Sequence, residues 1–225
     1  MKRALGLLLL LATVASVHAA QLKIFFGPTF SAYTGRWPSE IFPNPMGRSG
    51  GLNPFKNGRT GSLEGIELEF RLNPWLGMEI GGIYFTAGSS FSAPTAIFTV
   101  QKETYDMEGL SLPVLFTLKP HPGLFPYLLA GIDFAFILNH TRTSLVLPET
   151  AVIYREIARE DLRLATRKFD LAPVLGVGFE IAVLKQTFFA EAQYRLGLMN
   201  MVKGFPGTGA AARTRSLFFI VGYRM

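Results

Sequence analysis

The sequence of 225 residues contains no cysteine and three histidines. Without cysteine the protein has no disulfide framework and no thiolate chemistry. His121 and His140 are the histidines outside the N-terminal leader described below, and neither has a serine partner at a spacing that indicates a catalytic pair. The sequence therefore predicts a protein that is not an enzyme, and it indicates no cofactor and no metal site.

Long apolar runs are also scarce, and the longest one lies at the N-terminus. A basic pair precedes an apolar segment over residues 4–14, and a small-residue cleavage pattern ends at Ala19. Residues 1–19 therefore resemble a secretory signal peptide. The remainder, residues 20–225, has no linker at which to divide it and no second apolar stretch long enough for a membrane helix. We expect one exported domain that is either soluble or crosses a membrane as strands.

Alternating apolar residues dominate the exported part of the chain. In residues 104–139 two alternating runs flank a Pro- and Gly-rich turn at 119–123. Every second residue from Leu128 to Leu138 is apolar, which is the period of a strand. A helix over this run would be too short to cross a membrane and would leave Asp133 unpaired. We therefore expect a hairpin with one apolar face and with Asp133 pointing inward.

The same alternation recurs along the whole domain and predicts eight strands. The connections between them alternate in length, because tight turns follow the second, fourth and sixth strands. Long connections follow the other strands, at residues 35–61, 89–103, 140–167 and 199–214. The predicted strands cover residues 21–34, 62–72, 75–88, 104–118, 124–139, 168–184, 187–198 and 215–225.

This difference between the two ends favours one class of barrel over another. A soluble lipocalin-like barrel, our alternative, keeps its apolar face inward around a ligand and does not gather its long loops at one end. Outer-membrane barrels have short periplasmic turns, long outer loops and an apolar band flanked by aromatic residues. We predict an all-β fold, an eight-stranded antiparallel up-and-down transmembrane β-barrel in the bacterial outer membrane. Aromatic residues lie near both ends of its apolar face: Trp75, Phe188, Tyr223, Phe30, Tyr84 and Phe136.

Five stretches carry a family resemblance: LSLPVLFTLKP, YLLAGIDFAF, FDLAPVLGVGFE, FAEAQYRLGL and LFFIVGYRM. With them the chain resembles the PorT-like outer-membrane β-barrel proteins, related in architecture to the OmpA barrel, over nearly all of the exported sequence. The resemblance transfers no catalytic residue and implies a role in membrane integrity or secretion, with an envelope or secretion protein as a partner. The last stretch also resembles the assembly signal of bacterial barrels, which implies recognition by the barrel assembly machinery.

The inward faces of the predicted strands carry many ionisable residues. An eight-stranded barrel is just wide enough for side chains to fill it, so these charges must form pairs or hold water. We predict an ion-pair network in the lumen, and we regard an active site or a proton path as the lesser alternative. The predicted network consists of Lys23, Glu67, Glu69, Arg71, Glu79, Asp133, Asp170, Glu180, Glu191, Arg195 and Arg224.

Positive charge gathers in three of the predicted outer connections, residues 35–61, 139–168 and 199–215. Their summed net positive charge exceeds the net charge of residues 20–225 as a whole. Arginine forms bidentate, charge-assisted hydrogen bonds with phosphate. We therefore expect these connections to contact the outer-membrane lipid, lipopolysaccharide, and we expect no nucleic-acid partner. The candidate contact residues are Arg36, Arg48, Arg59, Arg213 and Arg215.

The segment 151–168 has two interpretations, a short helix or an extension of the neighbouring strands above the membrane. For the whole chain we expect a non-enzymatic outer-membrane barrel with a structural or interaction role in the cell envelope. A lipid-modifying enzyme with its site at the rim and a narrow, porin-like pore are the alternatives.

Overall fold

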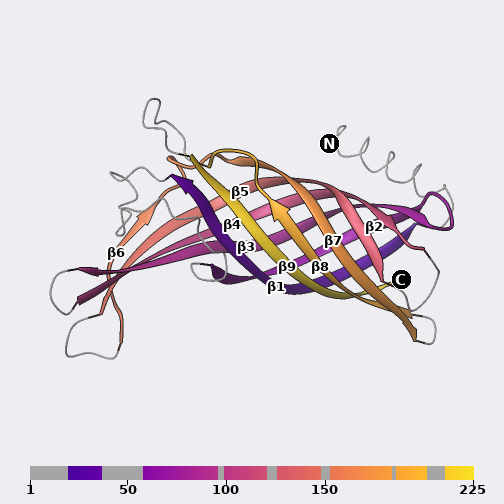
Figure 1. Cartoon of the computed structure of the whole chain (residues 1–225), viewed down its shortest axis with the longest axis horizontal. Coiled ribbons are helices and arrows are strands. Elements are labelled where there is room, and N and C mark those ends of the chain that lie inside the picture. Colours follow the sequence, from indigo (N-terminus) through magenta and orange to yellow (C-terminus); the bar gives the residue numbers. More distant parts are fainter. Residues whose placement is uncertain are drawn as a thin grey trace, which may run out of the picture.

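The computed structural model describes residues 20–36, 58–95, 99–120, 126–147, 153–183, 186–201 and 211–225, so the predicted signal peptide lies outside the described residues. The described residues form nine strands (Figure 1). They are β1 (Gln21–Arg36), β2 (Arg59–Arg71), β3 (Leu76–Thr95), β4 (Thr99–Leu118), β5 (Tyr127–Leu147), β6 (Arg155–Asp161), β7 (Phe169–Val183), β8 (Gln186–Leu196) and β9 (Ala211–Arg224).

Eight of these strands close into an antiparallel barrel. Their order is β4-β3-β2-β1-β9-β8-β7-β5, and β4 pairs with β5 to complete the ring. β6 stands outside the ring and pairs with the far end of β5. The two ends of the domain meet between β1 and β9, where Leu22 and Met225 exchange backbone hydrogen bonds of 3.1 and 2.9 Å. The predicted closed eight-stranded barrel is confirmed.

The strand faces follow the alternation in the sequence. On β4, Ser111, Leu115 and Thr117 are fully buried inside the barrel, whereas Leu112 and Phe116 remain about half exposed on its outer wall. The other strands repeat this pattern, so large apolar side chains cover the outside. An apolar surface of this extent is stable in lipid and not in water.

Aromatic rings lie on this outer wall toward both ends. Trp75, in the turn between β2 and β3, is 63% exposed, and the registered pair Phe188 and Tyr223 joins β8 to β9 at the same end. Toward the other end the rings of Phe136 and Phe169 lie 5.4 Å apart. Amphipathic and aromatic side chains at both edges of an apolar band are typical of a barrel that spans a membrane.

The interior is filled with side chains. Its apolar part includes Phe25 against Phe189, with ring centroids 6.4 Å apart, and Phe85 against Phe218, 6.1 Å apart. Small residues make room for the larger ones. A Cβ on Gly178 would lie 2.3 Å from the ring of Tyr127, so glycine at this position allows the tyrosine to lie over β7 toward β8.

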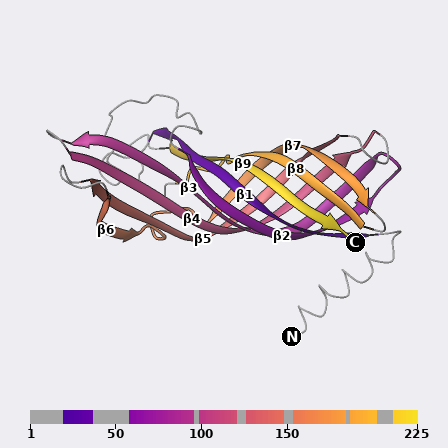
Figure 2. The same cartoon turned by 90° about the horizontal axis from the view of Figure 1, so that it is seen from below.

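Three barrel strands continue well past the closed ring, and β6 pairs there with one of them, β5. The structure extends β3 to Thr95, begins β4 at Thr99 and extends β5 to Leu147, and β6 adds to this sheet (Figure 2). The predicted loops at 89–103 and 140–167 were therefore wrong over much of their length. Outside lipid the outward positions become polar, so the apolar alternation that marks a strand disappears while the backbone pairing continues.

The segment after β5 extends the neighbouring strands, which is one of the two structures predicted for it. Residues 155–161 form β6, which pairs antiparallel with β5 from Thr141 to Val146, with an irregularity between Ser144 and Leu145. The short helix was the wrong alternative for these residues. At the other long connection, 199–214, β9 already begins at Ala211, three residues before the predicted loop ends.

Candidate functional site: the charged lumen and the outer rim

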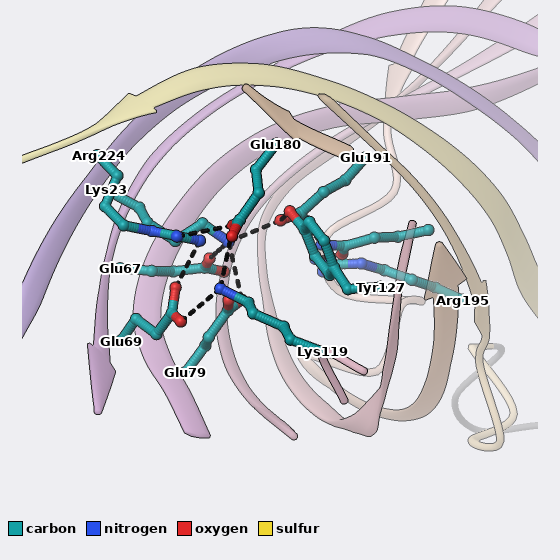
Figure 3. A network of polar contacts seen from close by, with 11 residues as sticks. Lys23, Glu67, Glu69, Glu79, Lys119, Tyr127, Glu180, Glu191, Arg195 and Arg224 are labelled. Atoms are coloured by element: carbon teal, nitrogen blue, oxygen red, sulfur yellow. Dashed lines mark hydrogen bonds and ion pairs between the residues drawn. The ribbon is translucent and has the colours of Figure 1, made fainter. Parts of the chain in front are cut away.

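A buried lysine forms the centre of the charged lumen (Figure 3). The ammonium of Lys23, on β1, lies 2.9 Å from Glu79 Oε2, 2.7 Å from Glu191 Oε1 and 3.6 Å from Glu67 Oε2. These partners come from β3, β8 and β2, so one side chain joins four strands across the barrel. All four groups are essentially inaccessible to solvent.

Glu191 is the best-coordinated carboxylate of this group. Besides Lys23, it accepts hydrogen bonds from the Tyr127 hydroxyl at 2.7 Å and from the Gln193 amide at 2.7 Å. Tyr127 reaches it from β5, across Gly178 of the intervening strand β7. The ammonium of Lys23 also lies 4.4 Å from the centroid of the Phe189 ring, a cation–π contact.

A second group of ion pairs lies toward the tight-turn end of the lumen. Lys119 Nζ contacts Glu69 Oε1 at 2.6 Å and Glu180 Oε2 at 3.2 Å. Arg224 bridges the same two carboxylates, at 2.6 Å to Glu69 and 2.8 Å to Glu180. Two cations and two carboxylates therefore form a closed ring, in which each charge has two opposite neighbours (Figure 3).

A third group lies around Arg195. Its guanidinium donates to Asp133 at 2.5 Å, to Ser111 at 3.0 Å and to the side-chain oxygen of Gln193 at 3.2 Å. It also lies 4.1 Å from the centroid of the Phe218 ring. Because Gln193 bonds both Arg195 and Glu191, this group is connected to the one around Lys23.

Two of the predicted lumen residues lie elsewhere. Asp170 is buried but separate, and it accepts bonds from Thr214 Oγ1 at 2.8 Å and from the Met199 amide at 3.0 Å. Arg71 is exposed at the end of β2 and forms no ion pair with any described residue, so its prediction as a network member was wrong. Its strand position has inward parity but lies beyond the layer that encloses the lumen. The structure brings the remaining predicted residues together: Lys23, Glu67, Glu69, Glu79, Asp133, Glu180, Glu191, Arg195 and Arg224.

The sequence interpretation missed Lys119 and Tyr127. Lys119 was assigned to the turn that follows β4, yet it keeps the inward parity of Leu115 and Thr117. Continuing the period of two by one residue would have found it. Tyr127 lay on the predicted inward face, but a tyrosine carries no formal charge and was not counted among the partners.

A second buried polar cluster lies above the lumen, in the extension. His140 on β5 is 2% exposed, and its ring nitrogens lie 3.1 Å from the Tyr33 hydroxyl and 2.6 Å from Thr166 Oγ1. Its ring also contacts Tyr105 at 6.3 Å between centroids. The sequence placed His140 in an outer loop. Its partners in the described residues are hydroxyls of tyrosine and threonine, and the histidine packs as part of the core.

The predicted lipid contacts fall into three groups. Arg213 is exposed and Arg215 half-buried on the outward face of β9, directly before the lipid-facing Leu217 and Phe219. Arg59 forms an ion pair with Asp106. The side chain of Arg36 and all of Arg48 lie outside the described residues.

Sequence comparison places the chain in a family. A family defined as outer membrane protein beta-barrel domain matches residues 15–203. The chain belongs to this family. Its members' location implies the bacterial outer membrane for this barrel, in agreement with the apolar outer wall. No curated protein matches the chain.

Solved structures of small barrels are similar to this member of the family at low identity. The attachment invasion locus protein Ail of Yersinia pestis, in complex with the heparin analogue sucrose octasulfate, is 12% identical, with 92% of this chain and 99% of that chain covered and a TM-score of 0.43. CarO2 of Acinetobacter baumannii is 14% identical, with 89% and 99% covered and a TM-score of 0.35. The outer membrane protease OmpT of Escherichia coli is 10% identical, with 93% and 97% covered and a TM-score of 0.35.

Two further observations concern the described residues alone. They contain no helix long and apolar enough to cross a membrane, a finding that does not bear on crossing by strands. They also contain no group of three or more histidine, aspartate or glutamate side chains placed to hold a metal ion.

Proposed function

We propose that the protein is a non-enzymatic, non-conducting outer-membrane barrel that anchors a β-sheet at the cell surface, where the sheet interacts with other components of the envelope. One observation supports this most directly. Linked ion pairs reach across the lumen. Lys23, on β1, joins carboxylates of β2, β3 and β8. Gln193 then connects Glu191, one of these carboxylates, to Arg195.

A pore would require this arrangement to open. An eight-stranded barrel has an interior just wide enough for its own side chains. Here charged groups and the rings of Phe25, Phe85, Phe189 and Phe218 occupy that interior. To admit an ion, the network would have to give up charge-assisted hydrogen bonds among buried partners, and removing one partner of such a pair is strongly unfavourable.

The sheet formed by β3, β4, β5 and β6 is the part available for interaction. It continues beyond the other strands, and every residue of β6 is exposed. The barrel does not need these residues for closure, because β4 and β5 already pair from Gly109 to Leu118 and from Leu128 to Ile137. A sheet kept beyond the closed ring is consistent with a purpose outside the membrane.

Two more specific versions of the proposal differ in the partner that the protein binds. The resemblance to PorT-like barrels favours an envelope or secretion protein. The outward-facing Arg213 and Arg215 favour the phosphorylated glycolipid of the outer leaflet, and the same partner is proposed for Arg36 and Arg48. Arg59 is the weakest member of that set, because Asp106 already neutralises it.

Conductance tests the closed lumen. Purified protein inserted into a planar lipid bilayer is expected to give no regular current steps, since no water-filled path crosses the ion-pair network. An open porin inserted in the same bilayer serves as the positive control. Insertion of the barrel is verified separately by its resistance to added protease. Reproducible unitary steps from the wild-type protein would refute the proposal and favour the narrow pore.

A further inference from the structure

A groove of about 590 Å³ lies on the outside of the barrel, where β5 leaves the apolar band. Phe136 and Leu138 form its wall on β5, and the turn after β6 forms the opposite side with Arg163 and Leu164. Lys168, just before β7, closes one end. The groove therefore combines large apolar side chains with cations at the edge of the lipid-facing surface.

The apolar side of the groove continues the lipid-facing band. Phe136 is 43% exposed and Leu138 50%, while Leu164, on the facing turn, is 92% exposed. A leucine this exposed would normally be free to fold back against the protein. Burying it against an apolar ligand would gain the transfer free energy of a whole side chain.

The backbone holds Leu164 in this outward position. Leu162 is buried, and its amide donates to His140 O at 2.8 Å. Its carbonyl accepts from the Ala165 amide at 3.0 Å and from Thr166 Oγ1 at 2.8 Å. Because both flanks of the turn are tied down, the side chain of Leu164 is presented by a rigid element and not by a loose loop.

Two cations lie where β7 begins, level with Ile137 at the top of the apolar band. Lys168 lines the groove, and Arg167 lies next to it but is not among the described lining residues. The Ile137 amide donates to Lys168 O at 2.8 Å, which places Lys168 beside the apolar wall. Arg167 is exposed next to it and donates from Nε to Asn200 O at 3.2 Å. Neither residue forms an ion pair with any described residue. Arg163 is different, because Asp161 accepts from its Nε at 2.7 Å.

The same cations connect with the outward arginines of β9. The Arg167 amide donates to Met201 O at 2.8 Å, and the Met201 amide donates to Ala212 O at 2.8 Å. Arg213 follows directly. Positive charge therefore continues from the groove toward Arg215, a span that suits a headgroup with more than one phosphate.

We propose that this groove binds one phosphorylated glycolipid of the outer leaflet, with an acyl chain on Phe136, Leu138 and Leu164 and a phosphate on Arg167 and Lys168. The site rests on the proposed function only in placing this rim at the cell surface. Among the described residues that line the groove, Asp161 is the one carboxylate. Arg163 forms an ion pair with it and so reduces its repulsion of phosphate. Guanidinium and ammonium groups together provide the charge-assisted bonds that phosphate accepts.

The test uses the full exported barrel in detergent micelles and measures lipid retention by native mass spectrometry. The probe is hexa-acylated lipid A with two phosphates, titrated against the same lipid without phosphates and against phosphatidylglycerol. The wild-type barrel is expected to retain one bisphosphorylated lipid A and to bind the other two lipids at least about tenfold more weakly, the loss of roughly one charge-assisted hydrogen bond.

Two variants separate the groove from general charge. Arg167→Gln with Lys168→Gln is expected to weaken lipid A binding roughly tenfold. Arg71→Gln with Arg155→Gln removes the same charge at places remote from the groove and is expected to leave binding unchanged. Leu164→Asn tests the acyl contact and is expected to weaken retention of lipid A without altering the preference for phosphate. Heat-modifiable migration in gels verifies that each variant is folded.

Three results would overturn the site. Equal weakening by the two double variants would mean that net charge alone attracts the lipid. Equal retention of phosphatidylglycerol would mean that any anionic lipid suffices, and equal retention of the dephosphorylated lipid would exclude the phosphate contact. None of these results would change the bilayer conductance, so the lipid site and the closed lumen can fail independently.

Discussion

Lys23 carries one positive charge among three buried carboxylates, and the three are not equivalent. Glu191 accepts from Lys23, Tyr127 and Gln193, whereas Glu79 Oε1 accepts no hydrogen bond from any described residue. One oxygen of Glu67 is in the same condition. The cluster therefore depends strongly on its single cation and weakly on the full charge of each carboxylate.

This asymmetry predicts changes in stability of different size for two substitutions. Lys23→Met should destabilise the barrel by about 3–5 kcal/mol, because it leaves buried carboxylates without a counter-charge. Glu79→Gln should change stability much less, because it retains an acceptor for Lys23 and lowers the excess of negative charge. Urea unfolding in lipid vesicles, followed by tryptophan fluorescence, measures both. Equal destabilisation by the two variants would contradict this view of the cluster.

Strand alternation in the sequence indicates which charged residues face inward, but it does not indicate where the lumen ends. Period-two alternation assigned Lys23, Glu67 and Glu191 to the lumen, because parity alone decides which face a strand residue occupies. It could not decide where the lumen ends. Arg71 has the right parity but lies in solvent, whereas Lys119, placed in a turn, reaches back inside. Such positions depend on strand length and stagger, which alternation does not encode.

At the scale of elements, the apolar band and the surface sheet follow different rules. Within the band, lipid enforces an apolar residue at every second position, so the strand signal is strong. In the extension, water contacts the outer wall, and residues such as Thr86 and Thr141 interrupt the pattern. The long upper parts of β3, β4 and β5 and the whole of β6 were therefore hidden in segments with loop-like composition.

The β5–β6 hairpin should be dispensable for folding and required for function. Residues 144–158 can be replaced by Asn-Gly, which joins the registered pair Thr143 and Arg159 through a tight hairpin turn. Since barrel closure lies in the lower part of the β4–β5 pairing, heat-modifiable migration is expected to persist. In a deletion strain with an envelope or secretion defect, the wild-type gene should restore the phenotype and the shortened gene should not. Full restoration by the shortened gene would argue against the surface sheet as the interacting part.

At the scale of the whole molecule, the two ends of the barrel differ in construction. One end holds the tight turn around Trp75 and the start of β1 and end of β9, which meet through Leu22 and Met225. The other end holds the surface sheet and its polar cluster around His140. An even number of strands places both ends of the domain on one side, and in outer-membrane barrels the short turns face the periplasm.

This orientation can be tested with single cysteines, because the chain has no cysteine of its own. Glu156→Cys lies on the exposed β6, and Pro74→Cys lies in the exposed tight turn between β2 and β3. A membrane-impermeant maleimide should label the first in intact cells and the second only after the outer membrane has been permeabilised. Both thiols should react equally in purified protein, which controls for accessibility. Labelling of Pro74→Cys in intact cells, with protection of Glu156→Cys, would show that the barrel has the opposite orientation. The proposed glycolipid groove would then face the periplasm, where its partner is absent.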